Sequence, residues 1–166
     1  PKGSVMRRQI NKEGRELVQS FEGLRLEAYL CPAGVPTIGW GHTGPNVTMP
    51  MKIDLSKAEA MLAKDLRRFE ECVARDCPDA TDSQFAAMVS LAYNIGSTAF
   101  KRSTVLRMHK AGKHKRAAAA FLMWVFARGK KLRGLVRRRR AEAALYRLPA
   151  PLWECAEGGI EKETDM

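Results

Sequence analysis

The sequence is short of acidic residues, of paired cysteines and of long apolar runs. Asp and Glu number 18 against 29 Lys and Arg in 166 residues, which gives a formal net charge of +11 and a pI near 9.9. Such an excess of positive charge indicates attraction to a polyanion, which could be a nucleic acid, an anionic membrane face or an acidic cell-wall polymer. Charge alone does not choose among these partners.

Apolar residues make up 45% of the chain, but they do not gather into a membrane span. The longest apolar run covers residues 117–127, which is too short to cross a bilayer and suits a buried helix. We therefore expect no transmembrane segment. The start of the chain also lacks a charged stretch followed by an apolar stretch and a cleavage site, so we expect an export signal to be absent or already removed.

The four cysteines are Cys31, Cys72, Cys77 and Cys155, and none belongs to a C-x2-C pair. Three scattered histidines do not complete a zinc site, so we predict no metal and no cofactor. Cys72 and Cys77 are five residues apart and could form a disulfide in an oxidising compartment. They could equally remain free thiols, packed as small hydrophobic side chains.

Capping signals and hydrophobic periodicity predict one short β region among helices. Asn11 is a candidate N-cap for a helix that ends at Gly23, and residues 24–42 are typical of a small hairpin or meander. Two capping boxes, at residues 56–59 and 81–84, predict helices that extend to Arg75 and Ile95. Further helices are expected over residues 104–110, 115–128 and 135–146.

These elements predict a mostly helical α+β fold with two lobes. We expect a single domain over residues 8–150, with a β lobe at about residues 24–55 and a helical lobe at about 56–150. Residues 151–166 are predicted to form an acidic, loosely ordered tail. A cleft is expected between the lobes, because ligand sites favour such junctions.

Glu22 falls in the last turn of the first predicted helix, between Phe21 and Gly23, with Leu24 beyond. The negative end of a helix dipole and apolar neighbours both disfavour a charged carboxylate, so we expect this group to keep a proton readily. A protonated carboxyl group is what a glycosidase uses to protonate a leaving oxygen. A solvated glutamate near a helix end would nevertheless be the commoner interpretation of this feature alone.

The residues around Glu22 change that balance. The segments 22–26, 28–29 and 37–42, with Cys31 between them, closely resemble the opening of the phage-type lysozymes, or endolysins. The pattern of that family is Glu, eight residues, Asp or sometimes Cys, five residues, and Thr, which Glu22, Cys31 and Thr37 match. The resemblance extends over roughly residues 10–148 and implies a lysozyme-like fold around a glycan-binding cleft.

The resemblance also implies roles for individual residues. Glu22 would be the catalytic acid, Thr37 would line the cleft and Cys31 would help to activate the attacking water. Cys31 is a departure from the best-known members, which have Asp, and a thiol near its ordinary pKa of about 8.5 is a weaker base at neutral pH unless its surroundings lower that pKa. Alternatively, Cys31 merely lines a turn.

Five further residues enter through the same resemblance. His42 and Asp65 would form a structural pair at the junction of the lobes, since a carboxylate on an apolar helix face must be paired. Asn94 and Ser103 would bind substrate, although each could equally cap a helix. Arg138 is the best match to an arginine that reaches the catalytic glutamate, and in a run of four arginines at least one must face inward.

The leading hypothesis from sequence is an inverting glycoside hydrolase that cleaves the β-1,4 bond between N-acetylmuramic acid and N-acetylglucosamine in bacterial peptidoglycan. It would be a monomer made in the bacterial cytoplasm and active at the cell wall, and its charge would attract it to an anionic outer-membrane surface. The alternative is a catalytically inactive cell-wall binder or a basic nucleic-acid-binding helical domain. No aromatic-interleaved basic platform supports nucleic-acid binding.

Overall fold

A computed structural model describes residues 7–152 of the chain, so most of the tail predicted for residues 151–166, with Cys155, lies outside the described residues. The elements follow one another in the order α1 Lys12–Glu22, β1 Arg25–Leu30, β2 Pro36–Gly39, β3 His42–Thr43, α2 Leu55–Asp76, α3 Asp82–Ile95, α4 Ser97–Lys101, α5 Thr104–Lys110, α6 His114–Ala120, the 3-10 turn Phe121–Met123, β4 Phe126–Ala127, β5 Lys130–Lys131 and α7 Arg133–Tyr146. The fold is therefore mostly helical with small sheets, as predicted.

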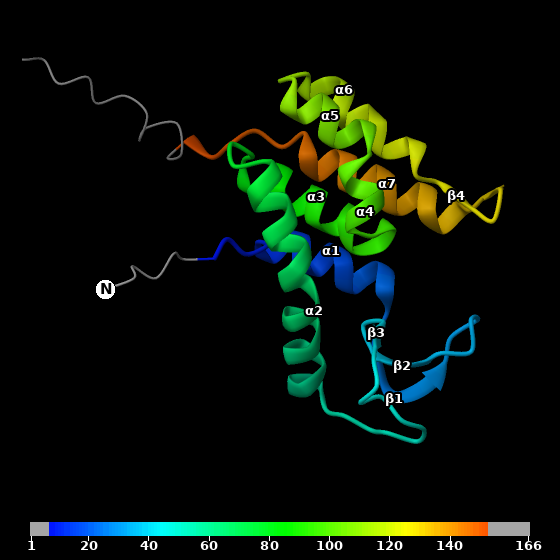
Figure 1. Ribbon diagram of the computed structural model, residues 1–166. Coiled ribbons are helices and arrows are strands. Elements are labelled where there is room, and N and C mark those ends of the chain that lie inside the picture. Colours follow the sequence, from blue (N-terminus) through cyan, green and yellow to red (C-terminus); the bar gives the residue numbers. More distant parts are fainter. Residues whose placement is uncertain (1–6, 153–166) are drawn as a thin grey trace, which may run out of the picture.

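Two lobes are joined by the long helix α2 (Figure 1). Strands β1, β2 and β3 form an antiparallel sheet at one end of the molecule, where Thr37 of β2 pairs with Thr43 of β3. The helical lobe surrounds α3, whose residues from Gln84 to Ala92 are all buried. Helix α1 precedes the sheet in sequence, yet it contacts α3 and α7 and so belongs to the helical lobe.

Each lobe has its own apolar core. The larger core lies around α3 and includes Phe85, Leu91 and Phe100, all of which are essentially inaccessible to solvent. A small core of Ala28, Ile38 and Val47 supports the sheet, and Ile53 packs against both cores. Helix α2 begins just after this contact, so packing near its start ties the sheet to the helices.

Local signals correctly predicted the ends of two helices that shape the site. The side chain of Asn11 accepts a hydrogen bond from the Gly14 N–H over 3.0 Å, and Gly23 ends α1 with a φ of 71°, which favours glycine. The capping box at the start of α3 is confirmed, because Thr81 and Gln84 each accept a hydrogen bond from the backbone of the other. Helix α1 therefore delivers Glu22 at its final position.

Two expectations about local structure are wrong. The proposed capping box at residues 56–59 does not begin α2, because Asp54 is the N-cap and its side chain accepts from the Lys57 N–H over 2.7 Å. The helix expected over residues 115–128 ends at Ala120, and the rest of the segment forms the 3-10 turn and the hairpin of β4 and β5. Arg128 and Gly129 both have positive φ, which matches a tight hairpin turn rather than a helix end.

The structure bears on two expectations, the state of Cys72 and Cys77 and the lack of a membrane-spanning helix. Cys72 and Cys77 are buried free thiols, so they pack as small hydrophobic side chains and do not form a disulfide. Burial raises the pKa of the Cys77 thiol to about 12, which keeps that group protonated and unreactive. Within residues 7–152, no helix has both the length and the apolar character needed to span a bilayer.

Candidate active site

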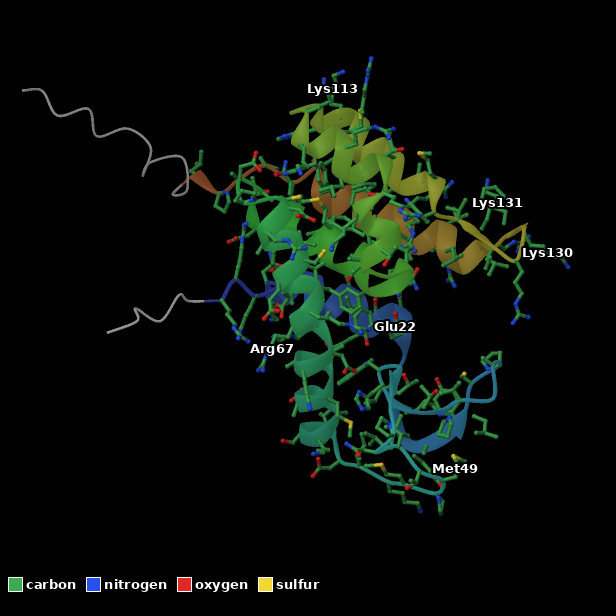
Figure 2. The ribbon with its side chains drawn as sticks, viewed as in Figure 1. Glu22, Met49, Arg67, Lys113, Lys130 and Lys131 are labelled. Carbon is green, nitrogen blue, oxygen red and sulfur yellow. The ribbon has the colours of Figure 1, made fainter. Side chains whose placement is uncertain are left out.

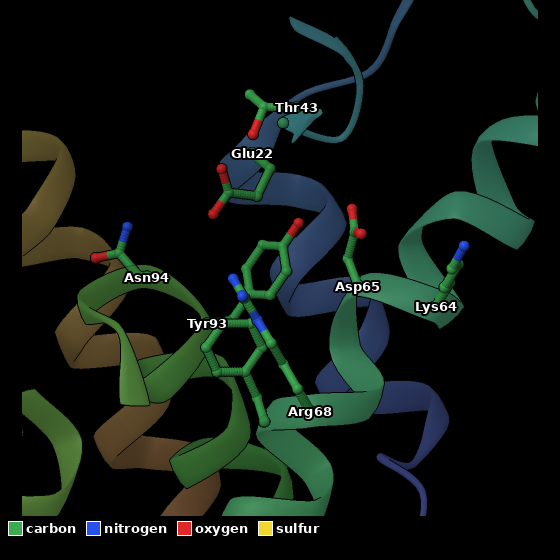
Figure 3. A pocket seen from close by; sticks show the side chains of 9 residues that line it. Glu22, Thr43, Lys64, Asp65, Arg68, Tyr93 and Asn94 are labelled. Carbon is green, nitrogen blue, oxygen red and sulfur yellow. The ribbon is translucent and has the colours of Figure 1, made fainter. Parts of the chain in front are cut away.

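A cleft of about 480 Å³ opens between the two lobes, and Glu22 lies in its wall. Figure 3 shows Glu22, Asp65 and Tyr93 pointing toward a common space from α1, α2 and α3. The cleft is lined by Glu22, Gly41, Thr43, Lys64, Asp65, Arg68, Phe69, Tyr93 and Asn94. Most of these side chains are polar, which suits a hydrated ligand such as a carbohydrate rather than an apolar one.

Glu22 is held by an arginine from the far end of the chain. Arg138 Nη1 donates to Glu22 Oε1 over 2.6 Å, and the Glu22 side chain keeps 22% of its surface exposed while that of Arg138 keeps 4%. The structure therefore brings together the two residues that the resemblance paired. Arg138 is buried behind Glu22 and does not line the cleft, so its contact is with the carboxylate rather than with the cleft volume.

A buried ionic network fixes Arg138 in turn. Glu142 is fully buried and accepts hydrogen bonds from Arg138 Nε over 3.1 Å, from Arg139 Nη1 over 2.7 Å and from Ser90 Oγ over 2.7 Å. Arg138 also donates to the Ser90 carbonyl over 3.2 Å. Two arginines of the run face inward, in line with the expectation of at least one, and the Glu142 carboxylate accepts hydrogen bonds from both.

Arg139 extends the network to the cleft. It donates to the Trp124 carbonyl over 2.8 Å and to Asn94 Oδ1, which places the Asn94 amide at the cleft wall. Burial lowers the pKa of Arg139, although the neighbouring Glu142 opposes that effect. Trp124 is partly buried against the core.

The predicted pair of His42 and Asp65 is present in the geometry. His42 Nδ1 lies 2.6 Å from Asp65 Oδ2, with 19% and 27% of the two side chains exposed. His42 belongs to β3 and Asp65 to α2, so the contact joins the sheet to the long helix at the bottom of the cleft. Asp65 also lines the cleft, which places the pair beside the reacting space.

Cys31 and Thr37 lie together but outside the cleft lining. Cys31 begins the turn after β1, where its carbonyl accepts from the Gly34 N–H over 2.8 Å. Hydrogen bonds from the backbone of Val35 and Ala33, and more weakly from the Thr37 hydroxyl, lower the pKa of the Cys31 thiol. The turn therefore favours the thiolate form of Cys31, while the Thr37 hydroxyl donates to the Val35 carbonyl over 2.9 Å and so braces the same turn.

Ser103 is placed as a helix cap. Its side chain accepts from the Leu106 N–H over 3.1 Å at the start of α5, and only 3% of the residue is exposed. Ser103 does not line the cleft, so the capping alternative describes its position. Asn94, by contrast, does line the cleft.

Sequence reasoning missed two neighbours of Glu22. Gly41 has a φ of 80°, and a Cβ atom built on it would lie 3.4 Å from Glu22 Oε2, so a glycine there both turns the chain and admits the carboxylate. Tyr93 donates to the Trp40 carbonyl over 3.0 Å and lines the cleft between Glu22 and Asp65. Burial, together with the Glu22 and Asp65 carboxylates, raises the pKa of Tyr93, which keeps its hydroxyl neutral.

The chain is similar to a known family of proteins. The model of the family described as phage lysozyme matches residues 19–142. The endolysin of Bacillus phage B103 is 43% identical over 143 residues, which is 82% of this chain but 53% of that protein, so the chain spans about half the length of this relative. The endolysin of Salmonella phage P22 is 39% identical over 83% of this chain and 97% of its own length.

This chain is also similar in structure to a solved muramidase domain. The muramidase domain of SpmX from Asticaccaulis excentricus superposes with a TM-score of 0.80 and 37% identity, covering 86% of this chain and all of that domain.

Proposed function

The chain belongs to the phage lysozyme family, and from that premise we propose that it is an endolysin that hydrolyses bacterial peptidoglycan. The bond cleaved is the β-1,4 linkage between N-acetylmuramic acid and N-acetylglucosamine. One observation carries the proposal: Glu22, a partly exposed carboxyl group, stands in the wall of an open polar cleft and is held at 2.6 Å by Arg138.

Glu22 is proposed as the general acid. It would donate its proton to the glycosidic oxygen as the bond to the anomeric carbon breaks, so that the leaving sugar departs as a neutral alcohol. The acid must hold a proton at that moment, which requires the ion pair with Arg138 to loosen when the glycan fills the cleft. Arg138 would then stabilise the carboxylate that the transfer leaves behind.

Cys31 is proposed to activate the water that attacks the anomeric carbon from the opposite face. The thiolate that the turn stabilises would accept a proton from the water, while the water oxygen forms the new bond to carbon. Thr37 would act indirectly, because its hydroxyl donates to the Val35 carbonyl and braces the turn that carries Cys31. Because the water attacks directly, the product anomer is inverted, and the thiol later returns its proton to solvent.

Asn94 is proposed to hydrogen-bond the sugar, since its amide lies on the cleft wall and is held in place by Arg139. Lys64 and Arg68 also line the cleft, and their charges suit the carboxylate groups of peptidoglycan. Arg138 would act on the substrate through Glu22, whereas Ser103 caps α5 and has no part in the proposed substrate contacts.

We propose further that the protein works as a monomer at the cell wall, after synthesis in the bacterial cytoplasm. Its net charge of +11 would concentrate it on the anionic surfaces of the bacterial envelope. No metal or cofactor has a part in the proposed reaction.

A turbidity assay on permeabilised bacteria tests the proposal, because hydrolysis of the wall clears the suspension. Glu22→Gln should abolish clearing and keep the fold, since the amide has no acidic proton to donate. Glu16→Gln is the matched control: it makes the same change on an exposed position of the same helix and should clear the suspension as the wild type does. Clearing by Glu22→Gln at the wild-type rate would remove Glu22 from the mechanism.

A further inference from the structure

The hairpin of β4 and β5 exposes apolar side chains next to cationic ones. Phe126 and Met123 each keep 60% of their surface exposed, and Leu122 and Leu132 each keep 43%. Val125 is buried, and side chains alternate along a strand, so Phe126 points away from the core. Lys131 is paired directly opposite Phe126 and therefore shares its face.

A cationic cavity adjoins the hairpin. It has a volume of about 580 Å³ and is lined by Lys131, Arg133, Val136, Arg137 and Arg140. Arg133, Arg137 and Arg140 are spaced as one face of α7, the face opposite the buried Arg138 and Arg139. A cationic rim around an apolar residue suits a ligand that combines phosphate with hydrocarbon.

No acidic side chain balances this surface within residues 101–152. Glu142 is the one acidic residue of that stretch, and it is fully buried and paired with Arg138 and Arg139. None of the exposed cations of the hairpin and cavity forms an ion pair with any of the described residues. Among the described residues this surface therefore carries unbalanced positive charge, which suits an anionic partner.

We propose that the β4–β5 hairpin and the outer face of α7 form a docking surface for an anionic phospholipid bilayer. Lys130, Lys131 and the α7 arginines bind the phosphate headgroups, and Phe126 and Met123 enter the boundary between headgroups and acyl chains. Figure 2 shows Lys130 and Lys131 extending outward from the hairpin at one end of the helical lobe.

The apolar side chains favour a bilayer over a soluble polyanion. A nucleic acid or an acidic polymer offers charge but no hydrocarbon for Phe126 and Met123. Single-stranded nucleic acids bind stacked aromatic platforms, whereas this surface presents one aromatic ring among aliphatic side chains.

Lipid docking goes beyond the proposed hydrolysis and does not depend on it. The hairpin and the cavity share no residue with the cleft lining. The full chain carrying Glu22→Gln should therefore bind vesicles as the wild type does, whether or not the wild type cleaves peptidoglycan. Loss of vesicle binding in that variant would contradict the separation of the two surfaces.

Cosedimentation with vesicles tests the docking surface. Vesicles of phosphatidylcholine with phosphatidylglycerol should bind the protein, and vesicles of phosphatidylcholine alone should bind it far more weakly. The double variant K130Q/K131Q should weaken binding by about fivefold for each lysine lost. The control K110Q/K113Q removes the same charge from exposed positions at and just after the end of α5, and Figure 2 shows Lys113 away from the hairpin. It should weaken binding by less than about twofold. Equal losses in both double variants would overturn the assignment to the hairpin.

Phe126→Ser separates lipid insertion from charge attraction. It should weaken binding to the anionic vesicles on the order of tenfold, because a phenyl group no longer leaves water, and leave binding to polyphosphate unchanged. Its melting temperature, read by circular dichroism, confirms that the variant is folded. Unchanged vesicle binding by folded Phe126→Ser would overturn the bilayer proposal in favour of a purely electrostatic surface.

Discussion

Arg138 and Glu142 lie one turn apart on α7, with Arg138 Nε 3.1 Å from Glu142 Oε1 and both side chains almost completely buried. This contact uses one edge of the guanidinium and leaves Nη1 directed at Glu22. The orientation of the proposed acid therefore depends on a carboxylate that never reaches the cleft. Arg138 forms ion pairs with both Glu22 and Glu142, so we expect a substitution of one carboxylate to alter how Arg138 contacts the other.

Glu142→Gln should lower the free energy of unfolding by about 3 kcal/mol, because it leaves Arg138 and Arg139 buried with less compensating charge. Urea denaturation measures the change. Glu59→Gln, at an exposed position of α2, is the control and should alter stability by less than about 0.5 kcal/mol. Where Glu142→Gln remains folded, its clearing of bacteria should also slow. A loss no greater than that of the control would mean that the network is not what holds Arg138.

The inward-facing arginines of α7 show how much of the site the sequence alone predicts. A helical run of four arginines must turn some of them inward, but periodicity does not say which ones or toward what. Arg138 and Glu22 are 116 residues apart, so their contact could be expected only from the resemblance to a family. The roles of Glu142 and Ser90 were missed. Sequence alone places a charged or hydroxyl side chain at the surface, and only the folded structure shows that these two side chains are buried and hydrogen-bonded to each other.

The β4–β5 hairpin is an element for which the sequence pattern predicted the wrong structure. Residues 117–127 form an apolar run that favours a helix by composition, and Gly129 is a plausible helix end. In the structure, Phe126 instead pairs with Lys131 in the hairpin of β4 and β5, and the preceding Val125 is buried. The capping signals at α1 and α3 were correct, and each cap is a contact between residues three apart. The same spacing at residues 56–59 was misleading, because Asp54 caps α2 instead.

Asp65→Asn should destabilise the protein by about 1–2 kcal/mol, since the 2.6 Å contact with His42 loses its negative partner in a largely buried place. Thermal and urea unfolding at neutral pH measure the loss. A double-mutant cycle with His42→Gln isolates the pair from the effects of each residue on the cleft. Additive losses in the cycle would show that the two side chains do not stabilise one another.

Glu70 should make stability fall as pH rises. Burial raises the pKa of this carboxyl group in the folded protein, although the Ile10 N–H, which donates to it over 2.6 Å, partly opposes the shift. Because the folded state holds this proton more tightly than the unfolded state, ionisation costs stability as pH passes from the ordinary glutamate value up through the raised one.

Glu70→Gln removes that ionisation and keeps an oxygen to accept from Ile10. The variant should therefore gain stability relative to the wild type between acidic and neutral pH, as measured by urea denaturation at each pH. Glu71→Gln, its exposed neighbour, is the control and should show a smaller change of the same measurement. A difference between Glu70→Gln and the wild type that does not vary with pH would contradict the burial argument.

Cys31 offers the sharpest test of the mechanism, because the turn lowers the pKa of its thiol below the usual range. If the thiolate is the base that activates water, activity should rise with pH through that lowered pKa. Cys31→Asp should retain or raise activity and move the rising limb to lower pH, because a carboxyl group ionises near pH ~4. Cys31→Ser and Cys31→Ala should lose most activity, since neither side chain can accept the proton.

The stereochemistry of the product separates this role from direct attack by sulfur. A thiolate that attacked the anomeric carbon would form a covalent thioglycoside, which water would then hydrolyse with overall retention of configuration. Attack by water gives inversion in one step. Proton NMR of the first reducing sugar released by the fully reduced protein distinguishes the two outcomes. An inverted anomer supports the water route, a retained anomer would sink it, and full activity of Cys31→Ala would remove Cys31 from the chemistry and leave the turn with a structural role alone.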